Sequence, residues 1–426
     1  MIHWEGKKMK TVDLVIIGGG SAGLAAALQA YEQGITNLLI LEKEDYLGGI
    51  LQQCIHSGFG LHQFKEQLTG PEYAQRYIDA ILEKKIPYQL HSMVYQITKD
   101  KHIYYTNQEE GCVKIKAKAI IMATGCIERT PGAIELEGAR PSGILTAGLA
   151  QKYMNIEGYM VGKKVFILGS GDIGLIMARR CVLEGAKVLG VAEIMPYSNG
   201  LTRNLVQCLQ DFNIPLYLSH TVKKVIGKDR VEKIVLTKVD ENLNPIENTE
   251  KVFDCDTLIL SVGLIPYNTL LTPLKVQMHS RTKGAIVDQN YQSSVPGIFS
   301  CGNALHVHDL VDYVSQEACL AANGAISYLK QKRQSKKTIS IVAKNGISYV
   351  VPQKIAFPLQ DKMELKFRVA RPFSQVSIQL VAQNQVIQTI KKRQCVPSEM
   401  EKLMLSFQSI PKNCQEIAIQ VLEEKQ

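Results

Sequence analysis

Residues 11–44 read TVDLVIIGGGSAGLAAALQAYEQGITNLLILEKE, and this stretch decides the fold of the N-terminal part of the chain. An apolar run of strand length is followed by a glycine-rich turn, an Ala- and Leu-rich stretch of helix length, and a second apolar run that ends at Glu42. This order predicts a strand–helix–strand unit with parallel strands. The same order returns at residues 163–194, KKVFILGSGDIGLIMARRCVLEGAKVLGVAEI, where the second apolar run ends at Glu193. The chain therefore contains two such units.

The glycines of both units follow the spacing G-x-G-x-x-G. They are Gly18, Gly20 and Gly23 in the first unit and Gly169, Gly171 and Gly174 in the second. In this motif the first glycine makes a tight turn, the second lets a pyrophosphate approach, and the third lets helix and strand pack closely. Amides at the helix N-terminus then face the phosphate. Each unit is therefore predicted to bind a dinucleotide.

An acidic residue stands 24 positions after the first glycine of each motif, Glu42 in the first unit and Glu193 in the second. A carboxylate there accepts hydrogen bonds from the ribose hydroxyls. The position near the N-terminus makes FAD the expected ligand of the first unit, and a nicotinamide dinucleotide that of the second. Glu193 would repel a 2′-phosphate, and no Arg follows at once in EIMPYSNG, so we expect NAD(H) rather than NADP(H). Arg203 lies further on and could weaken that preference.

The segments between and after the two units extend the same pattern. GCVKIKAKAIIMATGC at 111–126 predicts a hairpin strand that continues into a buried parallel strand, and CDTLILSVGLIPY at 255–267 is its counterpart in the second unit. VPGIFSCGNA at 295–304, with an Ala-rich helix at 315–330, should return to the first domain. We therefore predict a discontinuous FAD-binding domain at 1–128 and 290–333 and an NAD(H)-binding domain at 129–289.

A third domain is predicted at 334–426, after the Lys-rich stretch KQKRQSKK at 330–337. Five segments there alternate apolar and polar residues like half-buried antiparallel strands: TISIVA, MELKFRV, SQVSIQLVA, QVIQTI and EIAIQVL. They indicate a small β-sandwich. The fold class is thus α/β, with two Rossmann-like FAD/NAD(P)-binding domains and a C-terminal β-rich, sandwich-like domain.

Charge and composition exclude several classes of function. The net charge of +9 lies within residues 331–426, where charged residues alternate with apolar ones as on solvated strand faces. This pattern lacks the dense basic block of a nucleic-acid-binding arm; an acidic partner or peripheral association with a membrane surface is the alternative. The N-terminal apolar run is too short for a signal peptide or a membrane helix, and residues 1–8 could be an alternative-start extension. The ten scattered cysteines, without a C-x-x-C pair, favour a reduced, cytoplasmic chain.

Residues 10–333 resemble the pyridine nucleotide-disulfide oxidoreductase superfamily. Besides the glycine motifs, the resemblance rests on Ala123, Thr124 and Gly125, which close the FAD domain in that family, and on Gly302 and Asn303, which match its second flavin motif. The family has Asp where this chain has Asn303, whose neutral amide can still bond ribityl or phosphate oxygens.

Two segments resemble a narrower group. They are EKEDYLGGILQQCIHSGFGLHQFKEQLTGPEYA at 42–74 and CGNALHVHDLVDYVSQEA at 301–318, which are similar to the flavoprotein that accompanies anaerobic glycerol-3-phosphate dehydrogenase-type subunits. The resemblance implies an NADH-facing subunit of an oligomeric complex, with a dehydrogenase or oxidase flavoprotein as its partner.

The candidate catalytic side chains are Cys54 and His56. Only Cys54 follows Gly48-Gly49, so dithiol exchange is not expected. Cys54 could cycle through sulfenic acid or be an inert thiol, and His56 could activate it, bond a flavin carbonyl or be a satisfied loop residue. The motif H-x-H-D-x-x-D, with His306, His308, Asp309 and Asp312, is read as a structural network at the start of a helix, and no metal site is predicted.

We therefore expect an FAD-dependent NAD(H) oxidoreductase that passes hydride or electrons between nicotinamide and flavin. The expected setting is a glycerol-3-phosphate dehydrogenase-like complex. Two alternatives stay open: a free-standing NADH oxidase or peroxidase that uses Cys54, and a flavin electron-relay or structural subunit with little turnover of its own.

Overall fold

The computed structural model describes residues 9–330, 338–357 and 361–423. Two compact units are present: the first holds the chain up to residue 52, residues 57–126 and the chain from 266 onward, and the second holds residues 53–56 and 127–265. Residues 266–289, which the sequence interpretation gave to the NAD(H) domain, fall in the first unit in this division. The predicted boundary at 333/334 and the predicted extension at 1–8 lie outside the described residues.

The first unit is built on a seven-stranded sheet in the order β5-β2-β1-β8-β7-β6, with β20 beside β8. Strands β1, β2, β5, β8 and β20 are parallel, whereas β6 and β7 extend the sheet in antiparallel fashion. Their bounds are β1 Lys10–Ile17, β2 Leu38–Leu41, β5 Tyr88–Gln89, β6 Met93–Ile97, β7 His102–Asn107, β8 Gly111–Met122 and β20 Ile298–Ser300. The predicted hairpin strand and buried parallel strand of 111–126 are thus one continuous strand, β8.

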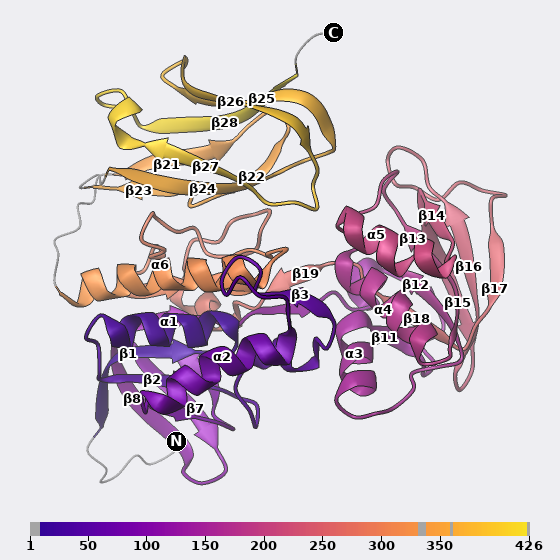
Figure 1. The fold of residues 1–426 in the computed structure, drawn as a ribbon, viewed down its shortest axis with the longest axis horizontal. Helices are drawn as coiled ribbons and strands as arrows, with labels where there is room; N and C mark the ends of the chain where they lie inside the picture. The colour runs from indigo at the N-terminus through magenta and orange to yellow at the C-terminus, as the bar shows by residue number, and fades with distance from the viewer. Residues whose placement is uncertain (1–8, 331–337, 358–360, 424–426) are drawn as a thin grey trace. The chain divides into compact units, whose positions relative to one another are not determined.

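Three helices pack in this part of the first unit: α1 (Ser21–Glu32), α2 (Gly70–Glu83) and α6 (Val311–Leu329). Helix α1 lies beside α6 (Figure 1). Its buried face consists largely of alanines, whose small side chains let the two helices approach closely. The apolar run of β1 is fully buried, as expected for a central parallel strand.

The second unit contains a five-stranded parallel sheet in the order β11-β18-β12-β13-β14. Its strands are β11 Ile144–Thr146, β12 Lys164–Leu168, β13 Lys187–Glu193, β14 Leu216–Leu218 and β18 Thr257–Leu260, and its helices are α3 Ala147–Asn155, α4 Asp172–Leu183 and α5 Thr202–Cys208. A four-stranded sheet accompanies it, with β10 Glu137–Gly138, β15 His220–Gly227, β16 Val231–Lys238 and β17 Lys251–Asp254. Both predicted strand–helix–strand units are confirmed.

The C-terminal residues form two sheets around a hydrophobic core of their own. One has the order β23-β21-β28-β25-β26 and the other β22-β24-β27. The strands are β21 Thr338–Ala343, β22 Ile347–Val351, β23 Lys354–Ala356, β24 Lys362–Val369, β25 Phe373–Ala382, β26 Gln385–Cys395, β27 Glu401–Ser406 and β28 Glu416–Glu423. All five predicted segments are strands, and β22, β23 and β27 were not predicted.

Four short strands complete the set of strands in the described residues: β3 Ser57–Phe59, β4 Leu68–Thr69, β9 Cys126–Glu128 and β19 Leu264–Pro266. Among the described residues, no helix is both long enough and apolar enough to cross a membrane.

Candidate functional site

The first glycine-rich turn joins β1 to α1, and two of its glycines are required by the chain itself. Gly18 has φ +107°, and a Cβ on it would lie 2.3 Å from the carbonyl oxygen of Ala123. A Cβ on Gly23 would lie 1.8 Å from the carbonyl oxygen of Gly18. Any side chain at either position would therefore collide with backbone.

Gly20 is required for a different reason. Its backbone has φ −79° and ψ −171°, which any residue can adopt. The nearest described atom to a Cβ on Gly20 is the Cα of Gly49, at 3.9 Å. The fold therefore has room for a side chain at Gly20, and its absence keeps the space over the first turn of α1 open. Because the first amides of a helix attract anions, this open space fits a pyrophosphate.

The second turn joins β12 to α4, and here too the backbone requires the first and third glycines but not the middle one. Gly169 has φ +101°, with a Cβ position 2.0 Å from the carbonyl oxygen of Ser261. A Cβ on Gly174 would lie 2.5 Å from the carbonyl oxygen of Gly169. At Gly171 the nearest described atom would be Ser261 Oγ at 3.6 Å, an ordinary contact. Here too the middle glycine is the one that the fold does not demand.

Glu42 is held rigidly at the end of β2. The backbone N–H of Gly19 donates to its Oε2 (2.6 Å), and the backbone N–H of Glu44 donates to its Oε1 (2.9 Å). The side chain is buried. Each carboxylate oxygen has further lone pairs, so both can still accept a ribose hydroxyl.

Glu193 repeats this arrangement in the second unit, at the end of β13. The backbone N–H of Ser170 donates to its Oε2 (3.0 Å), and the backbone N–H of Met195 donates to its Oε1 (3.0 Å). The Ser170 hydroxyl adds a bond to Oε2 (2.6 Å). In both units, then, the donors are the residue after the first glycine and the residue two positions after the acid.

The segment that follows β8 contacts the first turn. Ala123 faces Gly18, as above, and the Thr124 hydroxyl donates to the carbonyl oxygen of Tyr267 (2.7 Å). The Tyr267 N–H donates to the carbonyl oxygen of Gly125 (3.0 Å), whose φ is +69°. The predicted Ala-Thr-Gly segment thus lies beside the first glycine motif.

The sequence interpretation gave residues 255–267 as the counterpart of this segment in the second unit, but it did not single out Ser261 within that run. Ser261 follows β18, and its hydroxyl accepts the N–H of Gly174 (3.0 Å). The triplet Ser-Val-Gly at 261–263 matches Ala-Thr-Gly in place, and Gly263 has a positive φ as Gly125 does. In both units a glycine stands three residues after the last residue of a buried strand, and this spacing was the available signal.

The Gly302 turn lies at the same edge of the first sheet. β20 ends at Ser300, and the N–H of Cys301 donates to the carbonyl oxygen of Met122 at the end of β8. A Cβ on Gly302 would lie 3.0 Å from the Cβ of Ala22, in the first turn of α1. The carboxyl ends of parallel strands therefore bring together the predicted flavin residues, at the edge where ligands of such sheets bind.

Asn303 directs its amide oxygen toward His308. The His308 N–H donates to Asn303 Oδ1 (3.0 Å), and His308 Nδ1 lies 3.3 Å from the same oxygen. The amide nitrogen is then the group that Asn303 would offer to a flavin oxygen. This donor takes the place of the carboxylate that the family has at this position.

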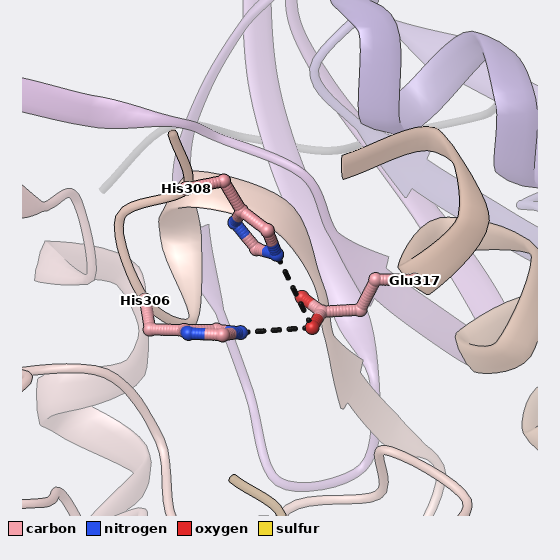
Figure 2. Close-up of side chains that lie close together, drawn as sticks. All are labelled: His306, His308 and Glu317. Carbon is pink, nitrogen blue, oxygen red and sulfur yellow. Dashed lines mark hydrogen bonds and ion pairs between the residues drawn. The ribbon is translucent and has the colours of Figure 1, made fainter. Parts of the chain in front are cut away.

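The two histidines of the H-x-H-D-x-x-D motif meet a carboxylate that the sequence interpretation did not name, Glu317. His306 Nε2 lies 2.8 Å and His308 Nε2 lies 3.4 Å from Glu317 Oε2. Figure 2 shows both imidazole rings directed toward this carboxylate. The motif's own acids have other partners. Asp309 accepts from Arg368 and from the N–H of Met400, and Asp312 accepts from the N–H of Gln63. The predicted network of these two acids with the histidines is therefore corrected.

A fourth member, Lys366 of β24, completes this buried cluster. Its Nζ lies 2.8 Å from Glu317 Oε2. Burial alone would raise the pKa of Glu317, but the Lys366 ammonium and the two imidazoles hold it well below its ordinary value. Burial would lower the pKa of Lys366, yet Glu317 outweighs burial and raises it. Burial lowers the pKa of His306 to about 4, so this imidazole is neutral at pH 7.

Cys54 and His56 lie in the short segment that belongs to the second unit. The Cys54 thiol is 3.7 Å from Gln151 Oε1, and burial raises its pKa to about 12. Burial, followed by the charges of Arg203 and Arg179, lowers the pKa of His56 to about 4. At neutral pH the pair is a thiol and a neutral imidazole, so it lacks the thiolate of a reactive cysteine.

Comparison with known proteins identifies the family. Residues 12–323 match the family model described as pyridine nucleotide-disulphide oxidoreductase. The chain belongs to this family. It is thus an FAD- and NAD(P)-dependent oxidoreductase, as the sequence resemblance implied.

Named relatives agree with this assignment, and a solved structure shares the fold. The ferredoxin–NADP reductase of Streptococcus pneumoniae serotype 2 (strain D39 / NCTC 7466) is 27% identical over 346 residues, covering 77% of this chain and 98% of the relative. The mitochondrial dihydrolipoyl dehydrogenase of Caenorhabditis elegans is 25% identical over 350 residues, covering 73% and 67%. The crystal structure of T. acidophilum thioredoxin reductase shares the fold, with a TM-score of 0.62, 22% identity and coverage of 76% and 99%.

Proposed function

We propose that this flavoenzyme is the NADH-facing subunit of a complex, and that it passes electrons between NAD(H) and a partner flavoprotein subunit of the glycerol-3-phosphate dehydrogenase type. The observation that carries the proposal is the repeated geometry of Glu42 and Glu193, each held by the same two backbone donors. When bound, FAD supplies a ring that exchanges hydride with nicotinamide and releases electrons to a second acceptor.

The role of the chain is to bind and orient the two dinucleotides. The open space at Gly20 and the Glu42 carboxylate would hold FAD, and Gly171 with Glu193 would hold the nicotinamide dinucleotide. Because Glu193 is a carboxylate fixed by both of its oxygens, a 2′-phosphate placed beside it would be repelled. This supports NAD(H) over NADP(H).

Two observations favour a protein as the electron partner over a disulfide. The sequence has no C-x-x-C pair, and burial raises the pKa of Cys54 to about 12, far from a thiolate. The streptococcal relative, matched along nearly its whole length, is named for a protein carrier, ferredoxin. Residues 42–74 and 301–318 are similar to the flavoprotein of glycerol-3-phosphate dehydrogenase-type complexes. This similarity supports a dehydrogenase subunit of that type as the partner.

Anaerobic stopped-flow spectroscopy of the purified yellow protein tests the proposal. NADH should bleach the flavin faster than NADPH, and reoxidation should be slow with air but fast with a glycerol-3-phosphate dehydrogenase-type subunit. Fast reoxidation by air alone would favour the oxidase alternative. Failure to bleach would leave an electron-relay subunit.

The cofactor preference is tested separately with Glu193→Gln, which keeps the shape of the side chain and removes its charge. Its preference for NADH over NADPH should fall by about tenfold, the equivalent of roughly 1.4 kcal/mol. Glu184→Gln is the matched control, because Glu184 lies at the end of α4 in a half-exposed pair with Arg180. An unchanged preference in Glu193→Gln would refute the assignment of this carboxylate to the ribose.

A further inference from the structure

We propose that Lys366 of the C-terminal domain is a positioning residue of the flavin site, which fixes the Gly302 turn through Glu317. This inference rests on the proposed role of Gly302 and Asn303 in binding FAD. It makes the C-terminal domain, which lies beyond the matched family residues 12–323, part of the flavin-binding device.

The alternation of β24 explains how a lysine reaches this position. Met363, Leu365, Phe367 and Val369 point into the core of the C-terminal domain. Their neighbours Glu364, Lys366 and Arg368 therefore face the other way. Lys366 is nevertheless only 2% exposed, because its ammonium is covered by Glu317 and lies over the ring of Tyr291.

Glu317 connects this lysine to the Gly302 turn. It lies about two turns into α6 and is fully buried. Its Oε1 accepts the N–H of Gly302 (2.9 Å), while its Oε2 accepts from Lys366 (2.8 Å) and lies 2.8 Å from His306 Nε2. A buried carboxylate that loses its counter-ion must take up a proton or turn toward water. A turn of the carboxylate toward water, or a proton taken up on Oε1, would remove the acceptor of the Gly302 N–H.

The rest of the Gly302 loop is held from the same domain. Arg368 donates to the carbonyl oxygen of Val307 (3.2 Å) and pairs with Asp309 (3.4 Å). The Nζ of Lys402, on β27, lies 3.3 Å from the ring centroid of Tyr313 in the first turn of α6. Three basic residues of one sheet thus contact the segment that carries the second flavin motif.

A metal ion is the rival interpretation of the same cluster. His306, His308 and Glu317 are near enough to one another to share a cation. The Lys366 ammonium already lies 2.8 Å from the carboxylate oxygen that both imidazoles face. A divalent cation there would face this charge at close range, so the ammonium itself serves as the counter-ion.

The test measures the Kd of FAD for the apoprotein by fluorescence titration, with visible circular dichroism of the bound flavin and thermal unfolding of each apoprotein. Lys366→Met should weaken FAD binding by about tenfold or more and change the flavin spectrum. Lys392→Met is the matched control, because Lys392 pairs with Glu401 in the same domain at a more exposed site. It should bind FAD as the wild type does.

Two charge-neutral double variants separate positioning from folding. Lys366→Met with Glu317→Gln keeps an oxygen for the Gly302 N–H and should bind FAD within about threefold of wild type. Lys366→Met with Glu317→Leu is equally neutral but removes that oxygen, and should bind about tenfold more weakly.

Three outcomes would count against this inference. Wild-type affinity in Lys366→Met would overturn it, and so would equal affinities in the two double variants. If the wild-type apoprotein itself bound no FAD, the proposed function would fall together with the inference.

Discussion

Replacing Gly20 by alanine should abolish tight FAD binding while leaving the apoprotein folded. The Cβ position is 3.9 Å from the nearest described atom, and the backbone of Gly20 suits alanine. Alanine is a poorer helix N-cap than glycine, but it also restricts the unfolded chain, so the net change in folding free energy should stay within about 1 kcal/mol. Gly23→Ala is the contrast, because its Cβ would lie 1.8 Å from the Gly18 carbonyl oxygen. The backbone would have to move, at about 3 kcal/mol or more.

The loss of FAD affinity follows from the bonds that the new methyl group would block. A hydrogen bond to a charged group contributes about 1.5–3 kcal/mol. Losing one or two of them as the pyrophosphate is pushed outward would raise Kd by roughly ten- to ten-thousandfold. Gly171→Ala should instead leave FAD affinity unchanged and weaken NADH, since it makes the same change in the second turn.

The assay is FAD titration of each apoprotein, with thermal unfolding in the absence of FAD. The expected pattern is normal unfolding with weak FAD binding for Gly20→Ala, early unfolding for Gly23→Ala, and normal FAD binding for Gly171→Ala. Wild-type FAD affinity in Gly20→Ala would refute the reasoning, and so would a loss of FAD affinity in Gly171→Ala that matched it.

Three further predictions concern other parts of the chain. Cys54→Ser should change the rates of flavin reduction by NADH and of reoxidation by less than about twofold, because a thiol of pKa about 12 is protonated at neutral pH. A loss of turnover in stopped-flow traces would instead support a catalytic role for the Cys54 thiol. Burial raises the pKa of Asp288 from 3.8 to about 6, so the wild type loses stability as the pH rises from about 4 to 6. In thermal melts above pH 6, Asp288→Asn should be more stable than the wild type by up to about 3 kcal/mol, with no gain below pH 4. A gain independent of pH would contradict this cause. Thr69→Ala removes the capping box that Thr69 forms with Glu72 at the start of α2 and should lower stability to urea by about 1 kcal/mol without changing FAD affinity; a weaker affinity would link α2 to the site.

The parts of the fold that could be predicted are those that depend on residues close together in the sequence. A Cβ on Gly18 would lie 2.3 Å from a carbonyl oxygen, so the position requires glycine. This glycine stands at a fixed spacing from the others of its motif, which makes the motif recognisable in the sequence. Glu42 and Glu193 were predictable because one directly follows β2 and the other ends β13, each at the same distance from its motif. Strands β22 and β27 were missed, since the first is nearly all apolar and the second begins with two charged residues.

The cluster around Glu317 could not be predicted from such patterns, because its members come from distant segments. The charges of the C-terminal strands were interpreted as lying on solvated faces, and for Lys366 this interpretation is wrong: the side chain is buried. Its counter-ion is an acid on the buried face of an Ala-rich helix. A carboxylate at the start of the Ala-rich stretch of this helix was the available signal, since a buried acid needs a partner.

The buried pair also changes how the C-terminal domain must be studied. A chain cut near residue 335 would lose Lys366, Arg368 and Lys402 together, and would leave Glu317 without its ammonium partner. Such a chain would lose these contacts to the Gly302 turn together with any surface that the domain offers to the proposed partner, so truncation would not separate the two roles. Substitutions on the exposed side of the domain, such as Lys391→Glu on β26, leave the Lys366–Glu317 pair intact. A partner contact that is lost in such a variant, with FAD still bound, would therefore belong to the domain surface itself.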